Sequence, residues 1–122
     1  MKRDLELIRK LLVHLEEKPT DEMIKELEIG GYDKDQVMYH FILMDEAGFI
    51  RCERIVSSST PDRVIKVHPF SLTWQGHEFL EAARNKKIWK SALNKVKGAS
   101  GSVSVEVLKE LLVAMLKEGV GL

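Results

Sequence analysis

The residues of this chain most able to do chemistry are cations gathered in one stretch. Residues 82–105 contain six Lys or Arg and no Asp or Glu, although the whole chain balances 19 basic against 19 acidic side chains. Cations spaced along one segment can follow a phosphate backbone, and Trp89 lies among them as a side chain able to stack on a base. The alternative is a solvated helix face with Trp89 in the core, because a helical tryptophan usually packs inside.

A second set of polar side chains would share this task if the chain binds nucleic acid. Basic residues recur in a predicted hairpin, and one predicted helix turns further polar side chains outward. The candidate nucleic-acid-binding residues are therefore Lys34, Gln36 and Tyr39 on that helix, Arg51, Arg54, Arg63 and Lys66 in the hairpin, and Lys86, Lys87 and Lys90 in the basic stretch. The helix itself is net acidic, which repels phosphates, because it also carries Asp33, Asp35, Asp45 and Glu46.

Residues typical of catalytic and metal sites are present, but not at usable spacings. The four histidines and Cys52 do not fall at i, i+4 or Cys-x-x-Cys spacing, and neither Gly-x-Ser-x-Gly nor a phosphate-cradling glycine loop occurs. His40 lies on an apolar helix face, which favours a hydrogen-bonded core histidine, and Cys52 in a predicted strand is expected to be a buried, inert thiol. We therefore expect a non-enzymatic protein without a metal or other cofactor.

The elements that would position these residues begin with an amphipathic helix over Asp4–Glu17. Its apolar residues recur at steps of three and four, and Pro19 ends it. The next segment, residues 20–31, is ambiguous, because Thr20 could cap a short helix through Leu27, whereas Leu27 also alternates with glutamates as in a strand. The pattern favours a turn of helix followed by a brief strand.

The helix that starts after Asp33 has complete start and stop signals. Asp33 is a good N-cap, Gln36 completes a capping box, and Gly48 stands where a helix ends. Met38 and Ile42 look outward on this helix, where they would pack on residues 20–29 or on another protein.

The rest of the chain predicts a hairpin and three more helices. Strands over 48–56 and 63–68 flank a polar turn, and Thr73 then caps a helix in which Gly76 permits close approach of another backbone. A basic helix over 86–97, a glycine joint at 98–101 and an apolar helix over 104–118 follow. The width of that last apolar stripe predicts packing against another part of the protein or against a second copy, and a homodimer through this helix is the expected partner. The candidate protein-interface residues are Met38, Ile42, Leu108, Leu112 and Met115.

Three strings carry a resemblance to known proteins. Tyr32–His40 (Tyr-Asp-Lys-Asp-Gln-Val-Met-Tyr-His), continued by Leu43–Ile50, resembles the recognition helix and first wing strand of winged-helix proteins. With Met1–Arg9 and Leu72–Leu80 (Leu-Thr-Trp-Gln-Gly-His-Glu-Phe-Leu), it is similar to an uncharacterised family of short bacterial and prophage-borne proteins with a winged helix. The resemblance covers most of the chain and implies a fold, a phage or mobile-element origin and an analogy to DNA binding, but no catalytic or binding residues.

Together these patterns predict a mainly α protein with a small antiparallel β-hairpin. We expect a winged helix-turn-helix core over residues 1–84 and a C-terminal helical extension over 85–122, packed on the core or on a second copy. The apolar runs are too short to cross a membrane, the N-terminus lacks the apolar region of a signal peptide, and a single cysteine suits a reducing compartment, so a cytoplasmic location is expected. Two functions remain open: a DNA-binding regulator that contacts double-stranded DNA, and an adaptor that binds another protein instead.

Overall fold

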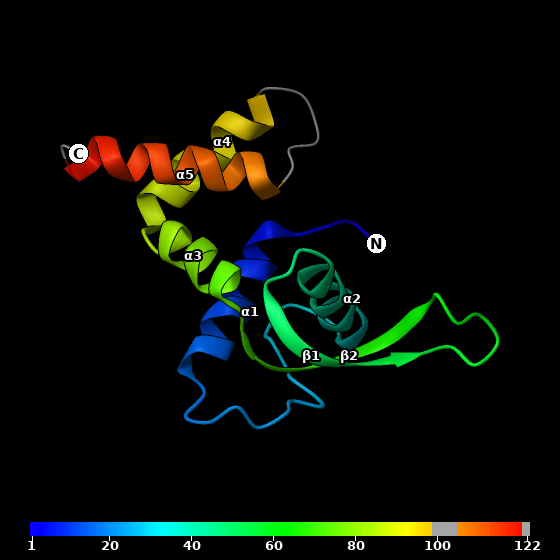
Figure 1. The fold of residues 1–122 in the computed structure, drawn as a ribbon. Helices are drawn as coiled ribbons and strands as arrows, with labels where there is room; N and C mark the ends of the chain where they lie inside the picture. Colours follow the sequence, from blue (N-terminus) through cyan, green and yellow to red (C-terminus); the bar gives the residue numbers. More distant parts are fainter. Residues whose placement is uncertain (99–104, 121–122) are drawn as a thin grey trace. The chain divides into compact units, whose positions relative to one another are not determined.

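The computed structural model describes residues 1–98 and 105–120, which form a mainly helical α+β fold with five helices and one two-stranded antiparallel hairpin (Figure 1). The chain divides into two compact units, Met1–His77 and Glu78–Leu122, and the division falls inside the third helix. Each unit is therefore described by itself. None of the described helices is long and apolar enough to span a bilayer.

The first unit is built on helix α1 (Leu5–Glu17) and helix α2 (Lys34–Glu46). Asp4 caps α1 by accepting a hydrogen bond from the Leu7 N–H at 3.1 Å, and α1 ends just before Pro19, as predicted. The capping box of α2 is also confirmed, because Asp33 and Gln36 exchange side-chain to backbone hydrogen bonds of 2.8 and 3.0 Å. Gly48 follows with a positive φ of 75°, which glycine adopts without strain.

The prediction of a helical turn and a brief strand within residues 20–31 is wrong. The Thr20 hydroxyl accepts from the Glu22 N–H and starts no helix, and the segment runs without regular structure. It is held to the hairpin instead, since the Ile24 N–H donates to the Pro69 carbonyl at 2.9 Å and the Lys18 ammonium donates to the Phe70 carbonyl at 2.6 Å. No second helix of a helix-turn-helix therefore lies between α1 and α2.

The hairpin pairs strand β1 (Ile50–Val56) with strand β2 (Val64–Leu72). The register joins Ile50 to Leu72 and Arg54 to Val67, with irregularities near both ends. β2 runs beyond the predicted 63–68, because Pro69 and Leu72 are buried at the base of the hairpin. In Figure 1 the turn that joins the strands extends away from α2.

The start of helix α3 (Trp74–Ala83) is hydrogen-bonded to the turn between α2 and β1. The Thr73 N–H donates to the Phe49 carbonyl at 2.9 Å, and the Thr73 hydroxyl accepts from the Gly76 N–H at 3.1 Å. A Cβ at Gly76 would lie 2.2 Å from the Phe49 carbonyl oxygen. The predicted close approach of another backbone at Gly76 is therefore confirmed.

The second unit contains the C-terminal part of α3, helix α4 (Lys86–Gly98) and helix α5 (Val105–Val120). Asn85 caps α4 by accepting from the N–H groups of Lys87 and Ile88 at 3.0 and 3.1 Å. α4 packs along α5 and buries its apolar side, including Trp89, whose ring meets Phe79 edge-on with centroids 6.2 Å apart. Most of the predicted joint at 98–101 lies outside the described residues.

Candidate nucleic-acid-binding surfaces

Helix α2, the expected recognition helix, offers few free polar side chains. Gln36 is engaged in the capping box, and the half-buried Tyr39 lies edge-on to His40 with ring centroids 5.6 Å apart. Lys34 is exposed, but so are Asp33, Asp35 and Glu46. The exposed charge of α2 is therefore acidic, as its composition predicted.

The face of α2 that carries His40 is buried within the first unit. His40 is 1% exposed, its Nδ1 donates to the Gln36 carbonyl at 2.7 Å, and its Nε2 accepts from the Asp4 N–H at 2.7 Å. The Asp4 carboxylate also accepts from the Tyr32 hydroxyl at 3.0 Å, and burial together with this bond raises the pKa of Tyr32. The prediction of a hydrogen-bonded core histidine is confirmed.

Met38 faces the hairpin and not the solvent. Its sulfur accepts from the Val67 N–H at 3.3 Å, and it lines a cavity of about 390 Å³ between α2, β2 and residues 25–28. The cavity lining is mixed, since apolar side chains such as Phe41 and Ile65 stand beside charged ones such as Glu26 and Lys66. Ile42 on the same helix is also half-buried. Met38 was expected to pack on residues 20–29 or on another protein. Its hydrogen-bond partner is instead Val67 on β2, and residues 25–28 line the same cavity as Met38.

One of the four hairpin cations is neutralised within the first unit. The Arg54 guanidinium binds both carboxylate oxygens of Asp45 on α2 at 2.6 Å, and this hydrogen bonding lowers the pKa of Asp45. Arg51 donates to the Leu72 carbonyl at 2.9 Å, while Arg63 and Lys66 are exposed. The hairpin cations able to contact a phosphate are therefore mainly Arg63 and Lys66. Arg51 can contribute only the N–H groups that do not bind the Leu72 carbonyl.

Cys52 lies beside the same carboxylate. Burial first, and then the hydrogen bond and negative charge of Asp45, raise the pKa of the Cys52 thiol to about 11. The prediction was a buried thiol, but Cys52 is only half-buried. With its raised pKa the thiol stays protonated near neutral pH and is a poor nucleophile, which agrees with the expected inertness. Among the described residues, no three His, Cys, Asp or Glu side chains converge on a metal site.

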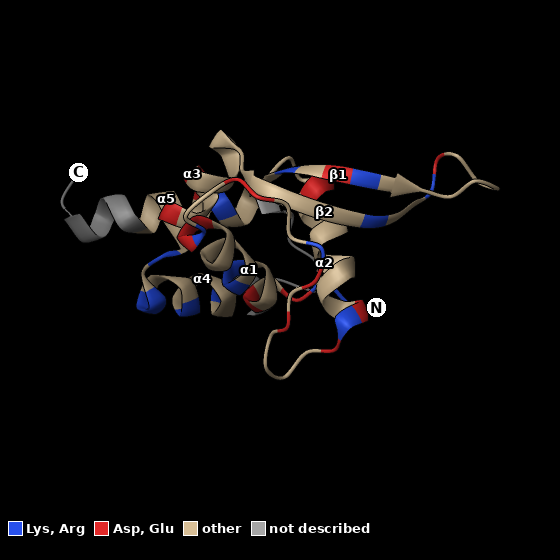
Figure 2. Ribbon diagram, turned by 90° about the horizontal axis from the view of Figure 1, so that it is seen from below, with Lys and Arg blue, Asp and Glu red and all other residues tan. Residues whose placement is uncertain are grey.

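Helix α4 presents a different surface. Lys86, Lys87, Lys90 and Lys95 are exposed, and Figure 2 shows basic positions along α4 without an acidic one between them. At about 100° per residue, Lys86, Lys87 and Lys90 fall within an arc of roughly 100° that also holds Asn94. We call Lys86, Lys87 and Lys90 the lysine face of α4.

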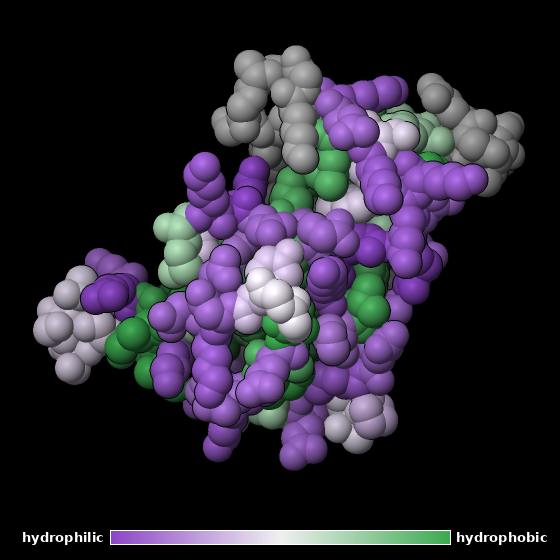
Figure 3. Space-filling view, turned by 180° about the vertical axis from the view of Figure 1, so that it is seen from behind, coloured by the Kyte–Doolittle hydropathy of each residue, from purple (hydrophilic) through white to green (hydrophobic). Residues whose placement is uncertain are grey.

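Three side chains that were candidates for binding a partner are buried within the second unit: Trp89, Leu108 and Leu112. Trp89 is 2% exposed, so it cannot stack on a base, and the packing alternative is the one observed. Leu108 and Leu112 of α5 are fully buried within the chain, so their side chains offer no surface for a second copy in this arrangement. Met115 keeps partial exposure. Figure 3 shows that hydrophilic side chains cover most of one face of the molecule, with smaller hydrophobic areas between them.

Sequence reasoning missed two features of the first unit. Trp74 is 75% exposed at the first position of α3, and the Asp45–Arg54 pair joins α2 to β1. The exposure of Trp74 could have been predicted from the sequence, because Trp74 precedes the inward Phe79 by five residues and so lies off the buried stripe of the helix. The ion pair had no sequence signal, since nine residues and a turn separate its partners.

Comparison with known proteins places the chain in a family. Residues 2–102 match the family described as hypothetical protein, DUF2513. The chain belongs to this family. It is also 32% identical over 120 residues to an uncharacterized protein of Haemophilus influenzae, covering 97% of this chain and 98% of that relative. No solved structure matches the chain. The prediction that the chain belongs to an uncharacterised family is therefore confirmed.

Proposed function

We propose that this DUF2513 protein is a non-enzymatic module that binds duplex DNA through the lysine face of α4. The observation that carries the proposal is the exposure of Lys86, Lys87 and Lys90 on one side of a helix whose other side is buried. Such a face is free to contact phosphates without disturbing the fold. Neutralising phosphates releases counterions, which drives binding that does not depend on base sequence.

The position of these lysines at the start of α4 supports a role outside folding. The first turn of a helix carries a partial positive charge, which favours acidic side chains there, yet α4 begins with two lysines and has no acid in its first turn. Lysines at this end oppose the helix dipole and cost stability. The same positive end attracts phosphate, so an arrangement unfavourable for folding is favourable for binding an anion.

The resemblance to winged-helix proteins adds a second contact to the proposal. The order α1, α2, β1, β2 is that of a winged helix without the middle helix of its helix-turn-helix, and in this proposal the hairpin reaches phosphates through Arg63 and Lys66. In this DUF2513 protein α2 would not read bases, because its exposed charge is acidic and Gln36 and Tyr39 are engaged. A small regulator of phage or mobile-element origin, dimeric through α5 at Met115, is the role that we propose for it.

The second candidate function, an adaptor for another protein, is favoured by the cavity beside Met38. A volume of about 390 Å³ lined by both apolar and charged side chains would accept a side chain of a partner. This function requires no DNA affinity, so one titration separates the two candidates.

The experiment is a fluorescence-anisotropy titration of a labelled random-sequence duplex of about 25 base pairs at low salt, repeated at several salt concentrations. We expect binding at micromolar protein, as is typical of non-specific contacts. The variant Lys86→Glu, Lys87→Glu, Lys90→Glu should lose at least tenfold in affinity. It should also lower the salt slope by about 2.7, because each phosphate contact contributes about 0.9.

The matched control carries the same change in charge in the first unit. The variant Lys2→Glu, Lys10→Glu, Lys25→Glu reverses three exposed lysines, one of them on α1. We expect it to keep most of the affinity and the salt slope. Equal losses in both variants would indicate that only net charge matters, and absence of binding at tens of micromolar would reject DNA as the ligand.

A further inference from the structure

Trp74 is exposed to a degree that packing does not explain. Its side chain is 75% accessible, whereas the other tryptophan, Trp89, is 2% accessible in the second unit. The start of α3 is secured by Thr73 and by the contact of Gly76 with Phe49, neither of which involves the indole ring. Tryptophan is enriched at binding surfaces, because its ring is large and apolar and its N–H can form a hydrogen bond.

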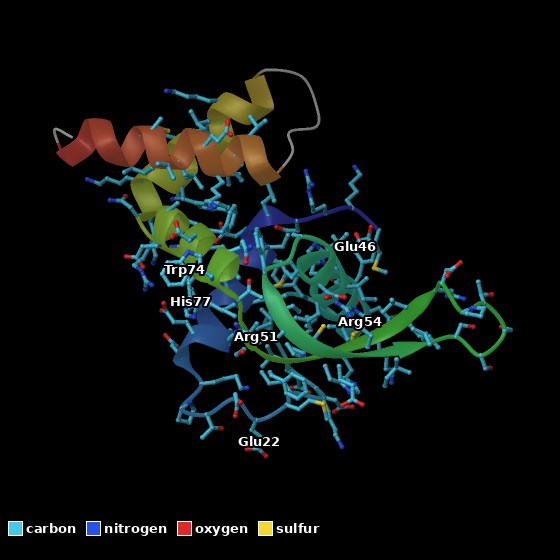
Figure 4. All side chains as sticks on the ribbon, in the orientation of Figure 1. Glu22, Glu46, Arg51, Arg54, Trp74 and His77 are labelled. Atoms are coloured by element: carbon cyan, nitrogen blue, oxygen red, sulfur yellow. The ribbon has the colours of Figure 1, made fainter. Side chains whose placement is uncertain are left out.

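The surroundings of Trp74 in the first unit are polar and partly cationic. Arg51 on β1 donates to the carbonyl of Leu72, two residues before Trp74, and so its guanidinium is held close to the start of α3. One turn along α3, His77 is exposed, and Gln75 between them is exposed as well. Figure 4 labels Trp74 and His77 on α3 and Arg51 on the neighbouring strand.

We infer that Trp74, with Arg51 and His77, forms a platform on which an unpaired base of a single-stranded nucleic acid stacks. This inference takes its ligand class from the proposed function but uses residues outside the lysine face of α4. Base stacking on aromatic side chains tolerates any base, and Arg contributes both a cation and hydrogen-bond donors. Bases within a duplex are already stacked on one another, so the platform selects unpaired nucleotides.

The side chains around Trp74 favour a nucleic acid over a protein partner. A tryptophan that anchors a protein interface usually lies in an apolar, well-packed centre, whereas Arg51, Gln75 and His77 are polar. Glu78, exposed on the same helix, opposes phosphates. Stacking must therefore supply most of the affinity, and binding at Trp74 should depend on salt less than binding by the lysine face of α4.

The test uses the tryptophans as reporters in the full-length protein, titrated with a 16-nucleotide oligothymidylate that forms no duplex. We expect saturable quenching of the tryptophan emission, because stacking on thymine quenches an exposed indole, while Trp89 is shielded. Trp74→Ala should remove the quenching and weaken oligothymidylate binding at least fivefold, the lower end for one stacked base. Arg51→Gln should weaken it by a smaller factor, with the quenching retained.

Two comparisons decide between outcomes. Trp74→Ala should leave duplex affinity and the salt slope unchanged, whereas the Lys86, Lys87, Lys90 variant should lower both and keep the quenching by oligothymidylate. Quenching that persists in Trp74→Ala, or equal losses on single-stranded and duplex DNA, would overturn the platform. A folded Trp74→Ala protein with unchanged oligothymidylate affinity would also overturn it and leave a protein partner for this surface, even if duplex binding by α4 holds.

Discussion

Helices α2 and α4 have the same length, 13 residues, but differ in how their surfaces are used. α2 contacts α1 through His40, β2 through Met38 and β1 through Asp45, so three of its sides serve the fold. α4 buries one apolar side and leaves a lysine face in solvent. The surface of α2, the expected recognition helix, is thus used mainly in packing. The exposed basic surface lies on α4, which was not expected to be a recognition helix.

The starts of the two helices sharpen the contrast. α2 begins with Asp33 and Asp35, which agree with the helix dipole, and its capping box satisfies the first amides. α4 has an equally good cap in Asn85 but places Lys86 and Lys87 in the first turn. The first arrangement is optimised for stability, and the second departs from the optimum in the one respect that favours an anion.

The largest effect on the α2 side should come from His40. Replacing it with Ala leaves the Asp4 N–H without its acceptor and opens a cavity between α1 and α2, so the free energy of unfolding should fall by about 2–4 kcal/mol. Urea unfolding followed by circular dichroism measures this. His14→Ala, at an exposed position of α1, is the control and should change stability by less than about 0.5 kcal/mol. An equal response of both variants would contradict a structural role for His40.

Because Asp45 of α2 lies beside Cys52, removing its charge should change the reactivity of the Cys52 thiol. Burial is the main cause of the raised pKa of Cys52, about 11, and the hydrogen bond and negative charge of Asp45 add to it. Asp45→Asn removes the charge, so the pKa should fall while burial keeps it above its ordinary value. At a fixed pH near 8 the thiolate fraction then rises, and alkylation by iodoacetamide should become several-fold faster. Mass spectrometry of timed samples gives the rates. Asp35→Asn, at an exposed position, should leave the rate unchanged.

The two caps should respond in the same direction, because each satisfies amides in the first turn of its helix. Asp33→Ala and Asn85→Ala each remove a side chain that accepts from first-turn amides, and each should lower the free energy of unfolding by about 1 kcal/mol. Thermal unfolding of both variants at one pH provides the comparison. A negligible cost for Asn85→Ala beside the full cost for Asp33→Ala would show that α4 is held by packing on α5 alone.

Most local features of this molecule could be predicted from the sequence, since their determinants lie within a few residues. The capping box, the stop at Pro19 and the positive φ at Gly48 are of this kind. Gly76 indicated a close approach, but its partner Phe49 lies far along the chain and was not predictable. The course of residues 20–31 was missed because Ile24 and the preceding Lys18 bond to the carbonyls of Pro69 and Phe70, far along the chain. For the candidate surfaces, composition indicated the cations, but only packing decides that Trp89 is buried, Trp74 exposed and Arg54 paired with Asp45.

The smallest predicted effect compares one position in the two helices, because Lys34 and Lys86 are each the first residue of their helix. Lys86→Glu places an acid at the positive end of α4 and should raise stability by about 0.3–1 kcal/mol while weakening duplex DNA binding. Lys34→Glu adds a third acid beside Asp33 and Asp35, so repulsion should cancel the dipole gain and leave both stability and DNA affinity nearly unchanged. Differential scanning calorimetry and the duplex titration measure the two quantities. A more stable Lys86→Glu protein with unaltered DNA affinity would separate the charge pattern of α4 from nucleic-acid binding.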